Sequence, residues 1–180
     1  MKRIVLYFIL IAIIAIQPGC GNKKDDGKKT STVSDTIQRH INPALAIYDL
    51  NGQEYSFSKF SGSVLLVNIW ASWVTSVPAE FEKLKKLQAE NKEKNFKIIS
   101  IALDDQYSEG FKKFYNTSDI NFDVYVSLNN SELLKNFTEY KDKIPCYYLV
   151  DKNMTIRKYS KNGLNVEEIL KEVKELLDEK

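Results

Sequence analysis

The stretch VLLVNIWASWVTSVPAEF, from Val64 to Phe81, decides the fold of this chain. It begins with an apolar run, continues through Trp70 and Trp73, and passes over a short polar step to Pro78. The apolar run predicts a buried strand, and the spacing that follows it predicts an amphipathic helix. A buried strand that enters a helix through a tight turn is the usual position of a functional site in an α/β protein.

The helix after this turn is supported by apolar side chains that repeat at helical spacing from Phe81 to Leu87. Thr75 or Ser76 can act as its N-cap, since a hydroxyl oxygen accepts from the free N–H groups of the first turn. Pro78 suits the first turn, where its missing N–H has no partner to lose. We therefore expect the helix to begin within a few residues of Trp73.

The rest of the chain alternates strand and helix patterns. A hairpin is expected from Ala44–Leu50 and Gln53–Phe57, with Asn51-Gly52 as a two-residue type I′ turn. Later elements are expected as a buried strand at Phe96–Leu103, a helix at Gln106–Asn116, a strand at Phe122–Leu128, a short helix at Ser131–Phe137, an edge strand at Met154–Tyr159, and a last helix capped by Asn165. This order predicts one α/β domain.

Two stretches carry a resemblance to a known family. The run from Asn68 to Trp73 followed by Ala79-Glu80-Phe81 resembles the active-site strand and helix of the TlpA/ResA group, which is related to the AhpC/TSA redoxins. The stretch Ile144-Pro145 to Asp151 resembles the loop with a cis proline that faces the active turn in that group.

The resemblance covers Pro43 to Leu177 and implies a thioredoxin-like α/β fold. The expected architecture is a central mixed sheet with helices on both faces and an N-terminal β-hairpin. Members of the group are membrane-anchored proteins that face outward from the cytoplasm. The resemblance therefore also implies an extracytoplasmic location.

The chain departs from the family at the active turn. Where the group has Cys-x-x-Cys, this sequence has Val74, Thr75, Ser76 and Val77. Dithiol exchange needs a thiolate at the helix N-terminus and a second thiol that resolves the mixed disulfide. Valine supplies neither, so we expect no dithiol–disulfide activity. Thr75 and Ser76 lack a nearby histidine as a base, which favours capping over nucleophilic chemistry.

Three other residues are candidates for the site. Glu80 matches a family glutamate near the active disulfide, although here it can simply favour the first helical turn. Trp73 either packs in the ordinary way or forms, with Thr75, Ser76, Ile144, Pro145 and Cys146, a surface for a protein partner. Cys146 is either a small buried hydrophobic residue or a single reactive thiol.

The N-terminus has the pattern of an export signal. Lys2-Arg3 precedes the apolar run Ile4–Ile16, which as a helix spans about 20 Å and is shorter than a bilayer core. Gly19-Cys20 resembles a lipobox, which implies a lipoprotein signal over residues 1–19 and lipidation of Cys20. Plain secretion or retention of the uncleaved signal are the alternatives. Residues 20–40 are predicted to be a lipidated, flexible tether and residues 41–180 the thioredoxin-like domain.

Composition excludes several classes. The chain has 26 basic and 24 acidic residues, and without Lys2 and Arg3 the two counts are equal, so no basic patch indicates nucleic acid. Cys20, Cys146 and His40 are the only cysteines and histidine, which is too few for a Cys/His zinc site. No cofactor or metal is predicted. Copper or haem delivery, known among relatives in cytochrome assembly, is disfavoured because the Cys pair is missing.

Two functions follow from these observations. The first is a membrane-anchored lipoprotein of the cell envelope, facing the periplasm or exterior, that lacks dithiol activity and binds an envelope protein. The second is an oxidoreductase that reacts with disulfides or peroxides through Cys146 alone and borrows a resolving thiol.

Overall fold

The computed structural model describes residues 35–92, 94–141 and 143–179. The predicted signal, the predicted lipidation site Cys20 and most of the predicted tether lie outside these residues. Within them, none of the helices combines the length and apolar character needed to cross a membrane.

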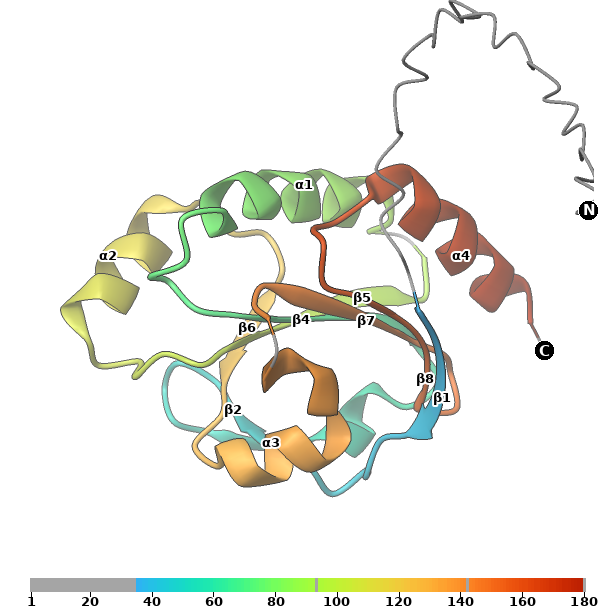
Figure 1. The fold of residues 1–180 in the computed structure, drawn as a ribbon, viewed down its shortest axis with the longest axis horizontal. Helices are drawn as coiled ribbons and strands as arrows, with labels where there is room; N and C mark the ends of the chain where they lie inside the picture. Colours follow the sequence, from blue (N-terminus) through green and yellow to red (C-terminus); the bar gives the residue numbers. More distant parts are fainter. Residues whose placement is uncertain (1–34, 93, 142, 180) are drawn as a thin grey trace, which may run out of the picture. The chain divides into compact units, whose positions relative to one another are not determined.

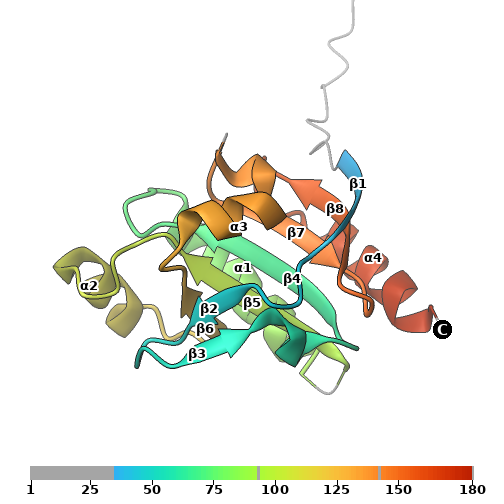
Figure 2. The same ribbon diagram turned by 90° about the horizontal axis from the view of Figure 1, so that it is seen from below.

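One eight-stranded mixed sheet forms the centre of the domain (Figures 1 and 2). Its strands, in the spatial order β1-β8-β7-β4-β5-β6-β2-β3, are β1 (Asp35–His40), β8 (Thr155–Ser160), β7 (Cys146–Val150), β4 (Val64–Trp70), β5 (Phe96–Ala102), β6 (Asp123–Val126), β2 (Ala46–Tyr48) and β3 (Glu54–Ser56). Strands β4, β5 and β6 are parallel to one another, and the other pairings are antiparallel. Every residue of β4 is buried, as its apolar sequence predicts for a central strand.

Helices cover both faces of the sheet. They are α1 (Val77–Glu90), α2 (Glu109–Thr117), α3 (Asn130–Asn136) and α4 (Val166–Asp178), with 3₁₀ turns η1 (Phe57–Phe60) and η2 (Thr138–Lys141). Figure 1 shows α1 and α4 on one side of the sheet and α3 on the other. The predicted mixed sheet with helices on both faces and a hairpin is confirmed.

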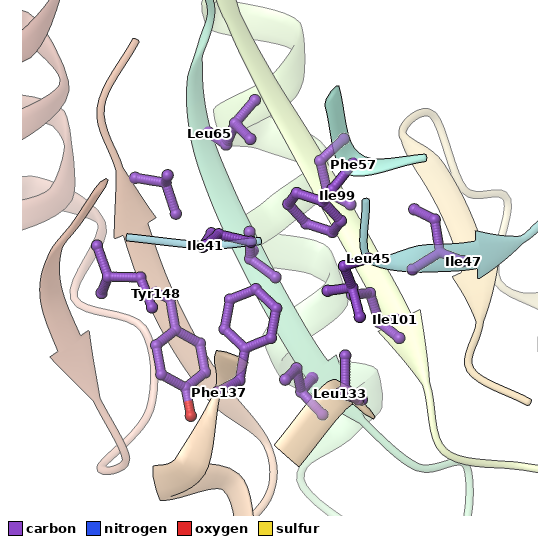
Figure 3. Close-up of a cluster of buried hydrophobic side chains, with 14 of the residues drawn as sticks. Ile41, Leu45, Ile47, Phe57, Leu65, Ile99, Ile101, Leu133, Phe137 and Tyr148 are labelled. Atoms are coloured by element: carbon purple, nitrogen blue, oxygen red, sulfur yellow. The ribbon is translucent and has the colours of Figure 1, made fainter. Parts of the chain in front are cut away.

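Each face has its own apolar core. On the α3 face, side chains from the central strands converge with those of α3 and η1, as Figure 3 shows for Leu65, Ile99, Phe57, Leu133 and Tyr148. On the other face, Trp70 packs against Phe81 of α1 and against Phe111 and Phe114 of α2, in a core to which α4 also contributes. Alternate residues of β4 and β7 therefore point into different cores.

The predicted boundary between tether and domain is wrong for residues 35–40. These residues form β1, which pairs antiparallel with β8, so that His40 lies opposite Thr155. Arg39 fixes this strand, because its guanidinium group donates to the Glu139 carboxylate at 2.7 Å and to the carbonyl oxygen of Asn136 at 2.9 Å. The domain thus begins no later than Asp35.

The hairpin was predicted correctly, but its turn was not. Tyr48 pairs with Glu54, which leaves the five residues Asp49–Gln53 in the loop. The Asp49 carboxylate accepts from the backbone N–H groups of Asn51 and Gln53, both at 2.9 Å. Gly52 has a φ of +82° whereas Asn51 has no positive φ, which rules out a type I′ turn.

Candidate functional site

The turn between β4 and α1 carries the apolar side chains Val74 and Val77, at the two positions where the resemblance places thiols. Val77 is the first residue of α1 and is fully buried, and Val74 is half-buried against the same core. Trp73 lies beside them with 66% of its surface exposed, so ordinary packing of this residue is ruled out. Trp70, three residues earlier, is fully buried. The two tryptophans therefore have different surroundings, and only Trp73 is available for contact with another molecule.

The predicted hydroxyl cap of α1 is only partly realised. Ser76 occupies the N-cap position, but its side chain makes no capping hydrogen bond, and its backbone is already helical (φ −81°, ψ −15°). A capping side chain normally needs extended backbone at this position to reach back to the N–H groups. Ser76 and Thr75 are both exposed, so their hydroxyl groups face solvent beside Trp73.

A carboxylate that the sequence did not indicate fixes the turn. Asp104, which follows β5 and is buried, accepts a hydrogen bond from the Ser72 backbone N–H at 2.8 Å and another from the Ser72 hydroxyl group. The carboxyl ends of β4 and β5 are adjacent because the strands are parallel. This pair holds the residue directly before Trp73 against the sheet.

The loop before β7 lies against the start of α1. The peptide bond between Ile144 and Pro145 is cis. Both residues line a cavity of about 210 Å³ together with Ser76 and Glu80 of the α1 segment. Two segments about 70 residues apart in the sequence therefore form one site, as the resemblance implied.

Glu80 connects three elements at this cavity. Its buried carboxylate accepts from the Tyr147 hydroxyl group of β7 at 2.9 Å, from the Leu164 backbone N–H before α4 at 2.8 Å, and from Lys83 Nζ at 2.7 Å. Gly163, which has a φ of +90°, lies close to the Glu80 side chain, and a Cβ atom at this position would lie 3.4 Å from Glu80 Oε1. The carboxylate is thus held by charge-assisted hydrogen bonds between neighbouring elements.

Cys146 does not belong to the exposed surface on which it was placed. Its side chain is 0% exposed and lies in the core on the α3 face, whereas Tyr147 points to the α1 face. The reason is the alternation of side chains along β7. Burial raises the pKa of the Cys146 thiol to about 12, which is unsuitable for a reactive thiolate. Of the two interpretations of this residue, the small buried hydrophobic residue is confirmed.

The remaining candidate chemistry is limited. Among the residues that the structure describes, no group of three or more His, Cys, Asp or Glu side chains is arranged to hold a metal ion. His40 is exposed on β1, in a strand that pairs only with β8. The site therefore consists of the exposed Trp73, the hydroxyl groups beside it, and the cavity next to Pro145.

Three of the solved structures with the same fold are described as secreted or as thiol–disulfide proteins. A secreted thiol-disulfide isomerase from Corynebacterium glutamicum matches with a TM-score of 0.71 at 17% identity, over 87% of this chain and 96% of that one. A thiol:disulfide interchange protein of the thioredoxin family from Chlorobium tepidum matches with a TM-score of 0.65 at 20% identity, over 79% of this chain and 99% of that one. A secreted disulfide oxidoreductase from Mycobacterium tuberculosis, homologous to E. coli DsbE, matches with a TM-score of 0.59 at 17% identity. The match covers 74% of this chain and 96% of that one. The fold is therefore thioredoxin-like.

Sequence comparison extends this result to the family. An uncharacterized protein of Haemophilus influenzae is 36% identical over 61 residues, which are 34% of this chain and 38% of that protein. The match thus spans well under half of that relative. The model of the AhpC/TSA family matches residues 39–159, which include β4, α1 and the loop before β7. The chain therefore belongs to the AhpC/TSA family.

Proposed function

We propose that this protein is an extracytoplasmic, membrane-anchored member of its family that has no dithiol–disulfide activity and acts by binding an envelope protein. The binding surface consists of Trp73, Thr75, Ser76, Ile144 and Pro145, and Cys146 is removed from it. The observation that carries the proposal is the pairing of a helix start without thiols with an exposed tryptophan. An exposed large aromatic side chain next to a cavity is typical of a protein contact.

The loss of redox chemistry is supported by the surroundings of the turn. Val77 fills a buried position at the first residue of α1, where the second, resolving thiol would stand, and Val74 occupies the position of the first, attacking thiol. Glu80 is occupied by three donors that join α1 to its neighbours. The structure also argues against the second function, because Cys146 is fully buried with a pKa near 12.

The location outside the cytoplasm is supported by the N-terminal sequence, with its positive residues, apolar run and Gly19-Cys20. Two of the structures with the same fold are themselves described as secreted. We propose that the lipid on Cys20 attaches the domain to the membrane. Radioactive palmitate incorporation that disappears in Cys20→Ala tests this part.

Crosslinking in whole cells tests the binding function. The full chain with a C-terminal tag is crosslinked, purified from solubilised membranes, and compared with Trp73→Ala and Leu128→Ala. Leu128 is the matched control, because it is 65% exposed on the loop between β6 and α3. A specific envelope protein is expected with the wild type and with Leu128→Ala, and its recovery falls at least about fivefold with Trp73→Ala, since exposed aromatic residues dominate such contacts.

An equal recovery from Trp73→Ala and wild type contradicts the proposed surface. Reduction of insulin disulfides by the wild type at a rate comparable to a thioredoxin contradicts the loss of dithiol activity. The two outcomes are independent, so each half of the proposal is tested separately.

A further inference from the structure

The cavity between the start of α1 and the loop before β7 carries excess positive charge. Lys143 and Lys161 line it from opposite segments, one before Pro145 and the other after β8. Both side chains are exposed, and no hydrogen bond or ion pair to either of them is found within the described part of the chain. Two unpaired ammonium groups at one cavity attract an anion.

The carboxylate at this cavity does not cancel that charge. Glu80 is the acidic residue among those that line it, and its charge is balanced by Lys83 at 2.7 Å. The carboxylate also accepts from the Tyr147 hydroxyl group and the Leu164 N–H group. Among the described residues that line the cavity, Lys143 and Lys161 therefore remain as the uncompensated charges, and the nearby N-terminus of α1 adds to the positive potential.

The size of the cavity limits what can enter it. Its volume of about 210 Å³ is below the roughly 300–1,000 Å³ typical of pockets for small molecules. A single acidic side chain fits this space better than a whole cofactor does. Trp73 lies at the same turn but outside the cavity. Its exposed ring can contact apolar residues that flank an acidic side chain bound in the cavity.

We infer that the cavity receives an acidic side chain from an extended segment of the partner protein, with its carboxylate between Lys143 and Lys161. This inference rests on the proposed binding function and specifies the chemistry of the partner. A segment with acidic residues next to an apolar one matches the cavity and Trp73 together, because charge complementarity sets specificity while aromatic contact supplies affinity.

Peptide binding tests the inference directly. The full chain in mild detergent is titrated into two fluorescein-labelled peptides, Gly-Glu-Phe-Glu-Gly and Gly-Gln-Phe-Gln-Gly, and anisotropy is measured. The acidic peptide is expected to bind at least about tenfold more tightly than the amide peptide. Its affinity falls between about 50 and about 500 mM NaCl, because salt screens exposed charges.

Charge-reversed variants locate the contact. Lys143→Glu combined with Lys161→Glu is expected to weaken binding of the acidic peptide at least about tenfold. Lys86→Glu combined with Lys174→Glu is the control, since it changes net charge equally at exposed helical positions on α1 and α4. Circular dichroism confirms that each variant is folded, and the single variants Lys143→Gln and Lys161→Gln replace the double variant if it is not.

Equal affinity for the two peptides, or an equal loss in the control variant, overturns the inference. The crosslinking experiment separates this failure from that of the proposed function. A partner that is lost with Trp73→Ala but retained with the Lys143/Lys161 variant refutes the acidic segment and leaves the binding function standing. A partner whose recovery is the same with Trp73→Ala as with the wild type refutes the binding surface itself.

Discussion

The hydroxyl group of Tyr147 lies 2.9 Å from the carboxylate of Glu80 and donates a hydrogen bond to it. This contact joins β7 to α1 directly beside the cavity. The same carboxylate oxygen accepts from the Leu164 N–H group, so the segment that leads into α4 is joined as well. One side chain thus positions the walls of the candidate binding site.

Glu80→Ala is expected to lower the free energy of unfolding by about 3 kcal/mol, because it leaves the buried Tyr147 hydroxyl and Leu164 N–H groups without an acceptor. Glu80→Gln is expected to lower the free energy of unfolding less, since its amide oxygen can still accept a hydrogen bond from these groups. Tyr147→Phe removes only a donor and costs about 1 kcal/mol. Urea unfolding of the variants measures all three values. Similar losses in Glu80→Ala and Glu80→Gln would contradict the assignment.

Introducing two thiols at the turn tests whether the surrounding structure can support dithiol chemistry. The double variant Val74→Cys, Val77→Cys places two thiols at the start of α1, where the helix N-terminus lowers a thiol pKa. It is expected to reduce insulin disulfides with dithiothreitol as the reductant, whereas the wild type stays at the uncatalysed rate. Val77→Cys alone is the control, because it lacks a second thiol at the turn. If the double variant is folded but inactive, the turn lacks more than two thiols for dithiol chemistry.

Cys146 is expected to resist iodoacetamide in the native protein. At pH 8 its pKa near 12 leaves almost none of it as thiolate, so native labelling should be at least about 100-fold slower than labelling in denaturant. Mass spectrometry of the peptide that contains Cys146 separates this thiol from Cys20. Comparable rates in the native and denatured states would restore the monothiol oxidoreductase as a candidate.

Stability is expected to fall at alkaline pH. Burial raises the pKa of Cys146 from 9.0 to about 12 and that of Tyr125 from 10.0 to about 12. Burial also raises the pKa of Tyr147 and of Tyr148 above the usual tyrosine range. Between about pH 9 and 12 the unfolded chain therefore binds fewer protons than the folded chain, so the free energy of unfolding decreases as pH rises.

Urea unfolding at pH 8, 9, 10 and 11 measures this slope. Cys146→Ala removes the first group to titrate, so its stability should decline less between about pH 9 and 10 than that of the wild type. A wild-type stability that does not change up to pH 11 would show that these groups are not buried as described.

Much of the fold was predictable because its strands and helices have strong local patterns. Every residue of β4 is buried, and α1 buries side chains at helical spacing, which is what the sequence of this stretch indicates. β1 was missed because its sequence, DTIQRH, is polar and continues a polar segment. Its position depends on pairing with β8 and on the contact between Arg39 and Glu139, 100 residues later, and neither leaves a local signal.

The site was predictable only in outline. Resemblance placed the Trp73 turn opposite the Pro145 loop, and the cavity shared by Ser76 and Pro145 agrees with this. Cys146 does not lie on the surface predicted for it, because a neighbour of Pro145 in the sequence can point to the opposite face of the sheet. Alternation along β7 was a signal that could have corrected this. The contacts of Asp104 with Ser72 and the position of Lys161 at the cavity depend on the packing of distant segments and had no such signal.

The hydrogen bonds of Glu80 give this residue a structural function that is separate from any chemistry. Replacing it would loosen β7 and the α4 connection from α1 whether or not any thiol is present. The folded domain therefore depends on this glutamate independently of any redox chemistry at the turn. Glu80 therefore does not by itself indicate enzymatic activity in this chain, because its bonds already give it a structural role.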